Sequence, residues 1–343
     1  MNAAPAGLLV APSWVGDTVL AQPLLQLLQE REPELAIDVL APPWTAPLAA
    51  RLPGVRSVIE SPFRHGELAL GRRRALAREL ARNRYRTAWV LPNSLKSALI
   101  PWFAGIGERV GFVGELRQWI LTDARRLDTA QLPQMVQRFA SLALAPGAAL
   151  PMTLPPPRLR VDAAGREAVL QRLGLDPGRP VAALCPGAEY GPAKRWPPTR
   201  FAELADALAA DGFQVWLFGS PKDGTITAEI MALGTCPMDR QPIDLAGRTS
   251  LAEAIDLMSL AQIVVSNDSG LMHVAAAIDR PLVALYGSSS PAFTPPISAR
   301  AHIVTLGLPC SPCFERECPL GHFNCMRQLT PQRVMESIAQ CRP

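Results

Sequence analysis

Residues 8–25 are "LLVAPSWVGDTVLAQPLL", the first strand-to-helix pattern in the chain. A short apolar run ends near Pro12, a Gly-Asp pair follows at Gly16 and Asp17, and an apolar pattern of helical type begins there. This is the pattern of a strand that leads into a helix, and open α/β sheets bind their ligands at the carboxyl ends of such strands. Asp17 has two interpretations at this point, because Asp is also a favoured N-cap residue whose role ends with starting a helix.

The same alternation of short apolar runs and helical patterns continues through the chain. The strands expected in the first half are residues 8–12, 37–40, 57–60 and 88–91. Those expected in the second half are residues 181–185, 214–218, 263–266 and 282–286. Residues 199–212, "TRFAELADALAADG", carry apolar residues at helical spacing between two of these strands. Strands that alternate with helices predict parallel sheets built from βαβ units.

The pattern predicts an α/β protein of two doubly wound, Rossmann-like domains that face each other across a cleft. A chain of 343 residues is long enough for two domains of about 150 residues. Residues 145–160, "APGAALPMTLPPPRLR", hold six prolines and glycines, which exclude a helix or a central strand. We therefore expect a first domain over 1–150, a Pro-rich linker over 151–160, a second domain over 161–329 and a terminal helix over 330–343. Periodicity does not say on which domain that helix packs.

Composition describes a folded protein with 48% apolar and 19% charged residues. No stretch reaches the roughly 18 consecutive apolar residues of a membrane span. The first residues lack the basic start of a secretory signal and fit a first strand, so we expect a cytoplasmic protein. The seven cysteines are then expected as thiols or metal ligands.

Positive charge is concentrated in one segment. The net charge is +4, but residues 64–86 alone hold eight arginines and two glutamates, or +6. The rest of the chain is therefore close to neutral. This distribution favours a local anionic partner over a surface that coats nucleic acid.

The clearest ligand motif is "IVVSNDSGLMHVAAA", residues 263–277, which runs from a strand through Asn-Asp-Ser-Gly into a helix. A helix start presents backbone N–H groups to an anion, Gly270 permits close approach and Ser269 adds a hydroxyl donor, so we expect a phosphate site here. Asp268 would repel a phosphate and is expected to cap the helix or to meet sugar hydroxyls. His273 lies one turn into the helix, with a ligand role and a structural role both open.

Lysine is rare in this chain, and each lysine follows an expected strand. The three are Lys96, Lys194 and Lys222, against thirty-four basic residues in total. An ammonium group is a compact charge suited to a single phosphate or oxyanion. Lys194 and Arg195 stand directly before the Trp-Pro start of a helix, where they could neutralise a diphosphate; solvated loop positions are the alternative.

Several common catalytic signatures are missing from the sequence. The first strand is not followed by G-x-G-x-x-G, and neither a Walker loop nor H-E-x-x-H is present. A G-x-S-x-G nucleophile elbow is also missing. Hydride transfer, P-loop phosphoryl transfer and serine hydrolysis therefore lose their usual support.

Five ordered segments together resemble the ADP-heptose:lipopolysaccharide heptosyltransferases, glycosyltransferase family 9. They are "SWVGDTVLAQPLL", "LPNSLKSALIPWFAGIGERVGF", "CPGAEYGPAKRWP", "NDSGLMHVAAA" and "CSPCFERECPLGHFNCM". The resemblance runs from about residue 7 to residue 340. It implies the two-domain B-type (GT-B) glycosyltransferase fold. The implied reaction is inverting, metal-independent transfer of L-glycero-D-manno-heptose from ADP-heptose to the inner-core heptose of Kdo2-lipid A.

The resemblance also implies roles for individual residues. Asp17 falls on the catalytic base, beside Gly16 on the acceptor side. Lys194 falls on a phosphate contact. The remaining donor-side positions are Asp268, Ser269, Gly270 and His273 around the diphosphate and sugar, and Lys222 and Asp223 near the nucleoside, with Glu229 as the alternative acidic residue.

The basic segment is given an acceptor role by the same resemblance. Its candidate contacts to the carboxylates and phosphates of Kdo–lipid A are Arg72, Arg73, Arg74, Arg78 and Arg82, together with Lys96. Attraction of about 1 kcal/mol per basic residue to anionic lipid would dock the enzyme transiently at the cytoplasmic face of the inner membrane. A solvated helix face is the plain alternative.

Four cysteines near the C-terminus form C-x2-C-x4-C-x6-C: Cys310, Cys313, Cys318 and Cys325, with His322 between the last two. Four thiols can surround a tetrahedral zinc ion, but this spacing lacks the paired C-x2-C pattern. A structural zinc, a redox-sensitive pair and a plain cysteine-rich loop are all open. The implied chemistry itself needs no cofactor.

Three other functions compete with this interpretation. The first is another enzyme of the same fold, either a heptosyltransferase of another step or a nucleotide-sugar transferase or epimerase that uses a different nucleotide. Thermal protection by ADP or UDP would show which nucleotide is used. The second is a two-lobed sugar- or nucleotide-binding protein without catalysis, which would not need Asp17. The third is nucleic-acid binding through the arginines and cysteines, which would show a steep salt dependence.

Overall fold

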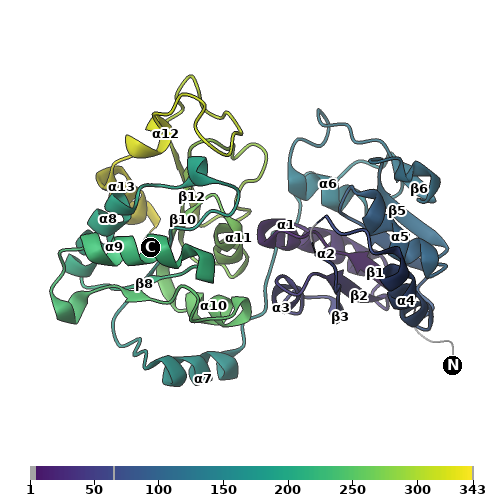
Figure 1. Cartoon of the computed structure of the whole chain (residues 1–343), viewed down its shortest axis with the longest axis horizontal. Coiled ribbons are helices and arrows are strands. Elements are labelled where there is room, and N and C mark those ends of the chain that lie inside the picture. Colours follow the sequence, from purple (N-terminus) through teal and green to yellow (C-terminus); the bar gives the residue numbers. More distant parts are fainter. Residues whose placement is uncertain (1–4, 65, 342–343) are drawn as a thin grey trace. The chain divides into compact units, whose positions relative to one another are not determined.

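The computed structural model describes residues 5–64 and 66–341. The chain divides into two compact units between Leu159 and Arg160, which we call unit 1 and unit 2 (Figure 1). Each unit is a parallel sheet with helices connecting its strands. This confirms the predicted α/β, doubly wound fold class.

Unit 1 contains a six-stranded parallel sheet in the order β3-β2-β1-β4-β5-β6. Its strands are β1 (Ala6–Val10), β2 (Ala36–Ala41), β3 (Val55–Glu60), β4 (Thr87–Val90), β5 (Glu108–Phe112) and β6 (Asp123–Arg125). Its helices are α1 (Val15–Leu20), α2 (Gln22–Arg31), α3 (Ala46–Ala49), α4 (Leu70–Ala81), α5 (Leu95–Phe103) and α6 (Met135–Ser141), with a 3-10 turn η1 (Arg117–Trp119). Every residue of β1 is buried, as expected for a parallel strand covered on both faces.

Unit 2 repeats the same topology with a sheet in the order β12-β11-β10-β7-β8-β9. Its strands are β7 (Val181–Cys185), β8 (Gln214–Leu217), β9 (Ile243–Asp244), β10 (Ala261–Asn267), β11 (Leu282–Tyr286) and β12 (Ala301–Thr305). Its longer helices are α7 (Ala163–Leu173), α8 (Pro198–Ala210), α9 (Gly224–Leu233), α10 (Leu251–Met258), α11 (Gly270–Ala277) and α13 (Pro331–Cys341). Shorter turns are α12 (Asn324–Arg327), η2 (Pro192–Lys194), η3 (Pro221–Asp223) and η4 (Met238–Arg240).

Both sheets have a topological switch point, where the connections leave two neighbouring strands in opposite directions. In unit 1 it lies between β1 and β4, where Leu8 pairs with Ala88. In unit 2 it lies between β7 and β10, where Leu184 pairs with Val265. Doubly wound sheets bind ligands at the carboxyl ends of such strand pairs. Ligands are therefore expected at the loops after β1, β4, β7 and β10.

The terminal helix α13 packs on unit 2, against α8, β11 and β12. Val334 and Ile338 are fully buried in the same hydrophobic core as Trp196 and Phe201. Burial of each such aliphatic side chain contributes about 2 kcal/mol. This answers the question that periodicity left open.

The strands that the sequence did not predict lie towards the sheet edges. β6 and β9 are edge strands of three and two residues, and β12 is an edge strand in which only Val304 is buried. An edge strand buries less surface than a central one, so its sequence lacks a continuous apolar run. β5, the remaining omission, has a charged and exposed start at Glu108.

Across the described part of the chain, none of the helices has the length and apolar character needed to cross a membrane.

Candidate active site

The switch point of unit 2 brings together Lys194 and Asp268, which the sequence places seventy-four residues apart. Lys194 Nζ donates to Asp268 Oδ2 at 2.6 Å. The Asp268 side chain is only 4% exposed and that of Lys194 is 18% exposed. The ammonium group thus compensates the carboxylate that would otherwise repel an anion. It also retains N–H donors for a further oxygen ligand, because an ammonium group has three.

Helix α11 begins immediately beside this ion pair. Ser269 is its N-cap in an extended conformation, and its own side chain makes no capping hydrogen bond. The Ser269 hydroxyl lies 3.2 Å from that of Ser266, the last but one residue of β10. A helix start of this kind offers backbone N–H groups and a positive dipole end to an anion. The Ser269–Gly270 step is therefore chemically suited to a phosphate.

His273 lies one turn further into α11 and is buried, with 4% exposure. Burial lowers the pKa of His273 to about 4; nearby Asp268 opposes this shift and Lys194 adds to it. The imidazole is neutral at pH 7 for this reason. Any contribution of His273 to an anion site comes from hydrogen bonding or packing rather than from positive charge.

Asn267, which sequence reasoning did not single out, holds the loop that carries Lys194. Its side-chain amide donates to the Pro186 carbonyl at 2.7 Å and accepts from the Trp196 backbone N–H at 3.1 Å. Asn267 and Trp196 are both fully buried. The two bonds span the 186–197 loop from its first residue to its Trp-Pro end. The signal was present as the Asn of Asn-Asp-Ser-Gly, but its partners lie far away in sequence.

Asp223 lies at the carboxyl ends of β7 and β8. Its carboxylate accepts from the Ser220 backbone N–H and hydroxyl, both at 2.8 Å. A Cβ atom added to Gly187 would lie 2.5 Å from this carboxylate, so the glycine after β7 makes room for it. Glu229, the alternative acidic residue, is exposed further along α9. Of the two acidic candidates, Asp223 is therefore the one that lies at the carboxyl ends of the strands.

Lys222 forms an ion pair with Glu189. Its ammonium group donates to Glu189 Oε1 at 2.6 Å, and both side chains are largely exposed. The hydrogen bond to Glu189 raises the pKa of Lys222. A pair of this exposure contributes little to stability and leaves Lys222 able to exchange partners.

In unit 1, Gly16 and Asp17 are the second and third residues of α1, after the switch-point strand β1. The N-cap of α1 is Trp14, without a side-chain capping bond. Asp17 is therefore not the N-cap, although its charge in the first turn suits the helix dipole. The Asp17 side chain is half-buried. These positions favour the interpretation of Asp17 as a site carboxylate.

The second switch-point loop of unit 1 is held by a buried arginine that sequence reasoning missed. Arg117 is fully buried and donates to Phe112 O at 2.8 Å and to Asn93 Oδ1 at 3.1 Å, and it also contacts Pro92 O. Burial lowers the pKa of Arg117 to about 10. The guanidinium remains charged at neutral pH beneath the loop that leads to Lys96. Lys96 itself is half-buried at the start of α5.

The arginines of α4 have different environments. Arg73 is buried, and its guanidinium donates to the backbone carbonyls of Leu68, Glu67 and Lys96. Because its N–H donors already bind backbone carbonyls, Arg73 is unsuited to the predicted contact with the acceptor substrate. Arg72 pairs with Glu67 and Arg74 stacks over Phe103 at 4.8 Å, while both remain at the surface.

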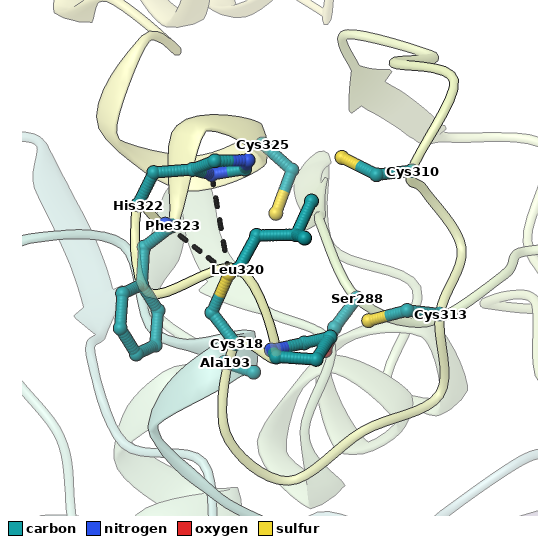
Figure 2. A pocket seen from close by; sticks show the side chains of 10 residues that line it. Ala193, Ser288, Cys310, Cys313, Cys318, Leu320, His322, Phe323 and Cys325 are labelled. Carbon is teal, nitrogen blue, oxygen red and sulfur yellow. Dashed lines mark hydrogen bonds between the residues drawn. The ribbon is translucent and has the colours of Figure 1, made fainter.

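The four clustered cysteines are free thiols that line a small cavity of about 20 Å³ with His322 and Ala193 (Figure 2). Cys318 Sγ accepts from the Phe323 backbone N–H at 3.4 Å, which lowers the pKa of this thiol. Among residues 5–64 and 66–341, no group of three or more His, Cys, Asp or Glu side chains is arranged to hold a metal ion. The zinc hypothesis is therefore unsupported. We call residues 310–325 the thiol loop.

Comparison with known proteins supports one family over nearly the whole chain. The family model of glycosyltransferase family 9 (heptosyltransferase) matches residues 73–324. Lipopolysaccharide heptosyltransferase 2 of Salmonella typhimurium is 45% identical over 336 residues, which cover 96% of this chain and 97% of that protein. The E. coli protein of the same name has the same identity and coverage.

Solved structures agree with the sequence comparison. The structure of E. coli ADP-heptose LPS heptosyltransferase II matches with a TM-score of 0.89 and 42% identity over 98% of each chain. A family 9 glycosyltransferase from Veillonella parvula matches with a TM-score of 0.85 at 20% identity, over 99% of this chain and 98% of that one. The second match supports the fold alone. Together they confirm the predicted GT-B-type architecture.

Proposed function

We propose that this chain, which belongs to glycosyltransferase family 9, the heptosyltransferases, acts as a heptosyltransferase II. Its donor is ADP-L-glycero-D-manno-heptose and its acceptor is the inner-core heptose of heptosyl-Kdo2-lipid A. The observation that carries this proposal is 45% identity, extended over 96% of the chain, to a lipopolysaccharide heptosyltransferase 2. The donor agrees with that of the matched E. coli enzyme, an ADP-heptose LPS heptosyltransferase II.

The donor binds in unit 2 at its switch point. Its diphosphate lies over the Ser269–Gly270 start of α11, within reach of Lys194 Nζ. Asp268 holds the ammonium group in place and, with its second oxygen, accepts from sugar hydroxyls. Asp223, at the carboxyl ends of β7 and β8, accepts from the ribose hydroxyls of the nucleoside. Neutral His273 packs behind the helix start.

The reaction is a single displacement with Asp17 as general base. The acceptor hydroxyl oxygen forms a bond to the anomeric carbon while the bond from that carbon to the ADP oxygen breaks. The hydroxyl proton passes to the Asp17 carboxylate, and ADP leaves with the bonding electron pair. One displacement inverts the anomeric centre. It needs a positioned base and charge stabilisation of the leaving group, each a general element of enzyme catalysis.

Stabilisation of ADP comes from groups of this chain. Lys194 supplies a full positive charge, and the first N–H groups of α11 supply a partial one. Because these groups already compensate the charge that develops on ADP, we expect heptosyl transfer to continue in the presence of EDTA.

The acceptor binds to unit 1, near Gly16 and Lys96. The exposed arginines of α4 and its C-terminal end interact with acidic sugars, lipid phosphates and anionic headgroups: Arg72, Arg74, Arg78 and Arg82. At about 1 kcal/mol per basic residue, these side chains give weak, salt-sensitive docking to the cytoplasmic face of the inner membrane.

The test is a matrix of donors and acceptors with the wild-type protein in EDTA. Product mass is measured with ADP-heptose or a UDP-sugar as donor and with Kdo2-lipid A or heptosyl-Kdo2-lipid A as acceptor. The proposal predicts one added heptose only with ADP-heptose and the heptosylated acceptor. Transfer to unsubstituted Kdo2-lipid A alone would assign the chain to the preceding heptose addition, and transfer from the UDP-sugar would overturn the donor.

A further inference from the structure

The loop that carries Lys194 is bound along its length to the thiol loop. The Ala193 backbone N–H donates to the Arg316 carbonyl at 3.0 Å. The Tyr190 hydroxyl donates to the Phe314 carbonyl at 2.7 Å, and Arg316 Nε donates back to the Tyr190 carbonyl at 2.7 Å. Three hydrogen bonds in both directions therefore join two segments that are more than one hundred residues apart in sequence.

Gly191 lies in close contact with the backbone of the thiol loop. A Cβ atom at this position would lie 2.4 Å from the Arg316 carbonyl oxygen and 3.0 Å from its carbonyl carbon. The backbone at Gly191 is extended, a conformation open to any residue. The glycine is thus required by the space between the loops and not by its own dihedral angles.

Tyr190 connects this contact to the ion pair of the site. Lys194 Nζ lies 5.1 Å from the centre of the Tyr190 ring, and the Arg316 guanidinium lies 5.4 Å from it. Cations near an aromatic ring at these distances are attracted to its face. Tyr190 therefore contacts the lysine with its ring and the thiol loop with its hydroxyl and carbonyl groups.

The thiol loop is itself fixed to the sheet of unit 2. The Phe314 backbone N–H donates to the Ser288 carbonyl at 2.7 Å, just beyond β11. A Cβ atom on Gly287 would lie 2.4 Å from Met326 Sδ and 3.1 Å from Cys325 Sγ, which places the far end of the loop against the same strand exit. The thiol cavity is lined by Ser288 at this strand exit and by Ala193 of the loop that carries Lys194 (Figure 2).

We propose that the thiol loop positions Lys194 for the donor diphosphate, with Tyr190, Gly191 and Arg316 as positioning residues. None of the three touches the reacting atoms. They act through Lys194, so the inference rests on the proposed function of that lysine. The cysteine motif, which the transfer reaction does not use, thereby gains a role as the lining of the cavity inside the supporting loop.

A double-mutant cycle between Gly191→Ala and Lys194→Met tests this proposal. ADP and adenosine affinities are measured by calorimetry, because only ADP carries the phosphates that Lys194 binds. Loss of a hydrogen bond to a charged group predicts ADP affinity about ten-fold weaker or more in Lys194→Met, and a loss of similar size in Gly191→Ala. Adenosine affinity is expected to stay unchanged in both. In the Lys194→Met background, Gly191→Ala should cause no further loss, since coupled residues are not additive.

Side-chain variants give an independent check. Tyr190→Phe removes the hydrogen bond to the Phe314 carbonyl but keeps the ring beside Lys194, and should raise the donor KM about five-fold with kcat nearly unchanged. Arg316→Gln should do the same. The matched control is Arg327→Gln, a neighbouring exposed arginine whose contacts are to Phe323 and His322 and not to the Lys194 loop. Gly107→Ala, with no atom closer than 4.0 Å to the added carbon, controls for the glycine substitution.

The outcomes separate this inference from the function on which it rests. Wild-type protein that fails to bind ADP would overturn the proposed function and the inference together. Wild-type protein that binds ADP while Gly191→Ala binds it equally well would overturn the inference alone. An equal loss of adenosine and ADP affinity, or a full additional loss in the Lys194→Met background, would also overturn it, because the loop would then act on something other than Lys194.

Discussion

The buried imidazole of His273 makes the stability of unit 2 depend on pH. Burial lowers the pKa of His273 from 6.5 to about 4 in the folded protein, whereas the unfolded chain keeps the ordinary value. Between these two values the unfolded chain binds a proton that the folded chain does not. Linkage then requires stability to be complete above pH 6.5 and to fall as the pH falls towards 4.

The size of the effect follows from the width of that interval. Each unit of pKa difference corresponds to about 1.4 kcal/mol, so the interval from 6.5 to about 4 amounts to about 3 kcal/mol for this one group. That is a large fraction of the roughly 5–15 kcal/mol by which domains are stable. Carboxylates elsewhere also titrate below about pH 5, so the wild-type profile alone does not isolate the histidine.

His273→Gln isolates it, because glutamine is neutral over the whole range. Urea unfolding of wild type and variant is compared at about pH 7.5, 6, 5 and 4.5, and the difference between the two proteins is plotted against pH. The substitution itself shifts the variant by a constant amount. The wild type should lose stability relative to the variant by about 1 kcal/mol per pH unit below about pH 6. A pH-independent difference would refute a buried, neutral imidazole at this position.

Three further predictions concern contacts around the same site. Lys194→Met leaves the Asp268 carboxylate buried without its cation and should cost about 3 kcal/mol of unfolding free energy, most of which Asp268→Asn restores in the double variant; urea unfolding measures the coupling. Asn267→Ala leaves two buried backbone groups without partners and should cost about 3 kcal/mol of unfolding free energy by the same assay. If Asn267→Ala costs the same in the Lys194→Met background, the two substitutions act independently. Cys318, whose thiolate is favoured by the Phe323 N–H, should react with iodoacetamide before the other cysteines at about pH 7.5, as followed by peptide mass spectrometry; first labelling elsewhere would contradict that assignment.

The central strands could be predicted from the sequence because parallel strands leave a strong pattern. β1, β7 and β11 are buried along their whole length and therefore appear as continuous apolar runs. β6 and β9 were not predicted because an edge strand of two or three residues is too short to show a continuous apolar run. Strand order was not readable from composition, but once known it explained why the motif loops meet at two switch points.

Part of the candidate site could be singled out from the sequence, and the contacts that were missed join residues distant in sequence. Loop position and residue type were enough to single out Asp17, Lys194 and Asp268. They could not show that Asp268 pairs with Lys194, because no local pattern links residues seventy-four positions apart. Arg73 was grouped with its exposed neighbours for a similar reason, since burial of one arginine within an Arg-Arg-Arg run depends on the carbonyls that surround it.

Buried polar residues are the second group that could not be predicted from the sequence. Asn267 and Arg117 each hold a loop by hydrogen bonds to backbone groups, and both are fully buried. From residue type alone, such side chains are expected at the surface, because polar residues are mostly exposed. Their partners become visible only when the strands are placed side by side.

A comparison of wild type with Asp17→Asn tests whether this carboxylate is the general base of a heptosyltransferase. ADP release and product mass are followed with ADP-heptose and heptosyl-Kdo2-lipid A in EDTA, and ADP binding is measured in parallel. We expect acceptor-dependent transfer by wild type, loss of transfer by a factor of about 10² or more in the variant, and unchanged ADP affinity. Undiminished transfer by Asp17→Asn would show that the carboxylate is not the base, and would return Asp17 to a structural role in the first turn of α1.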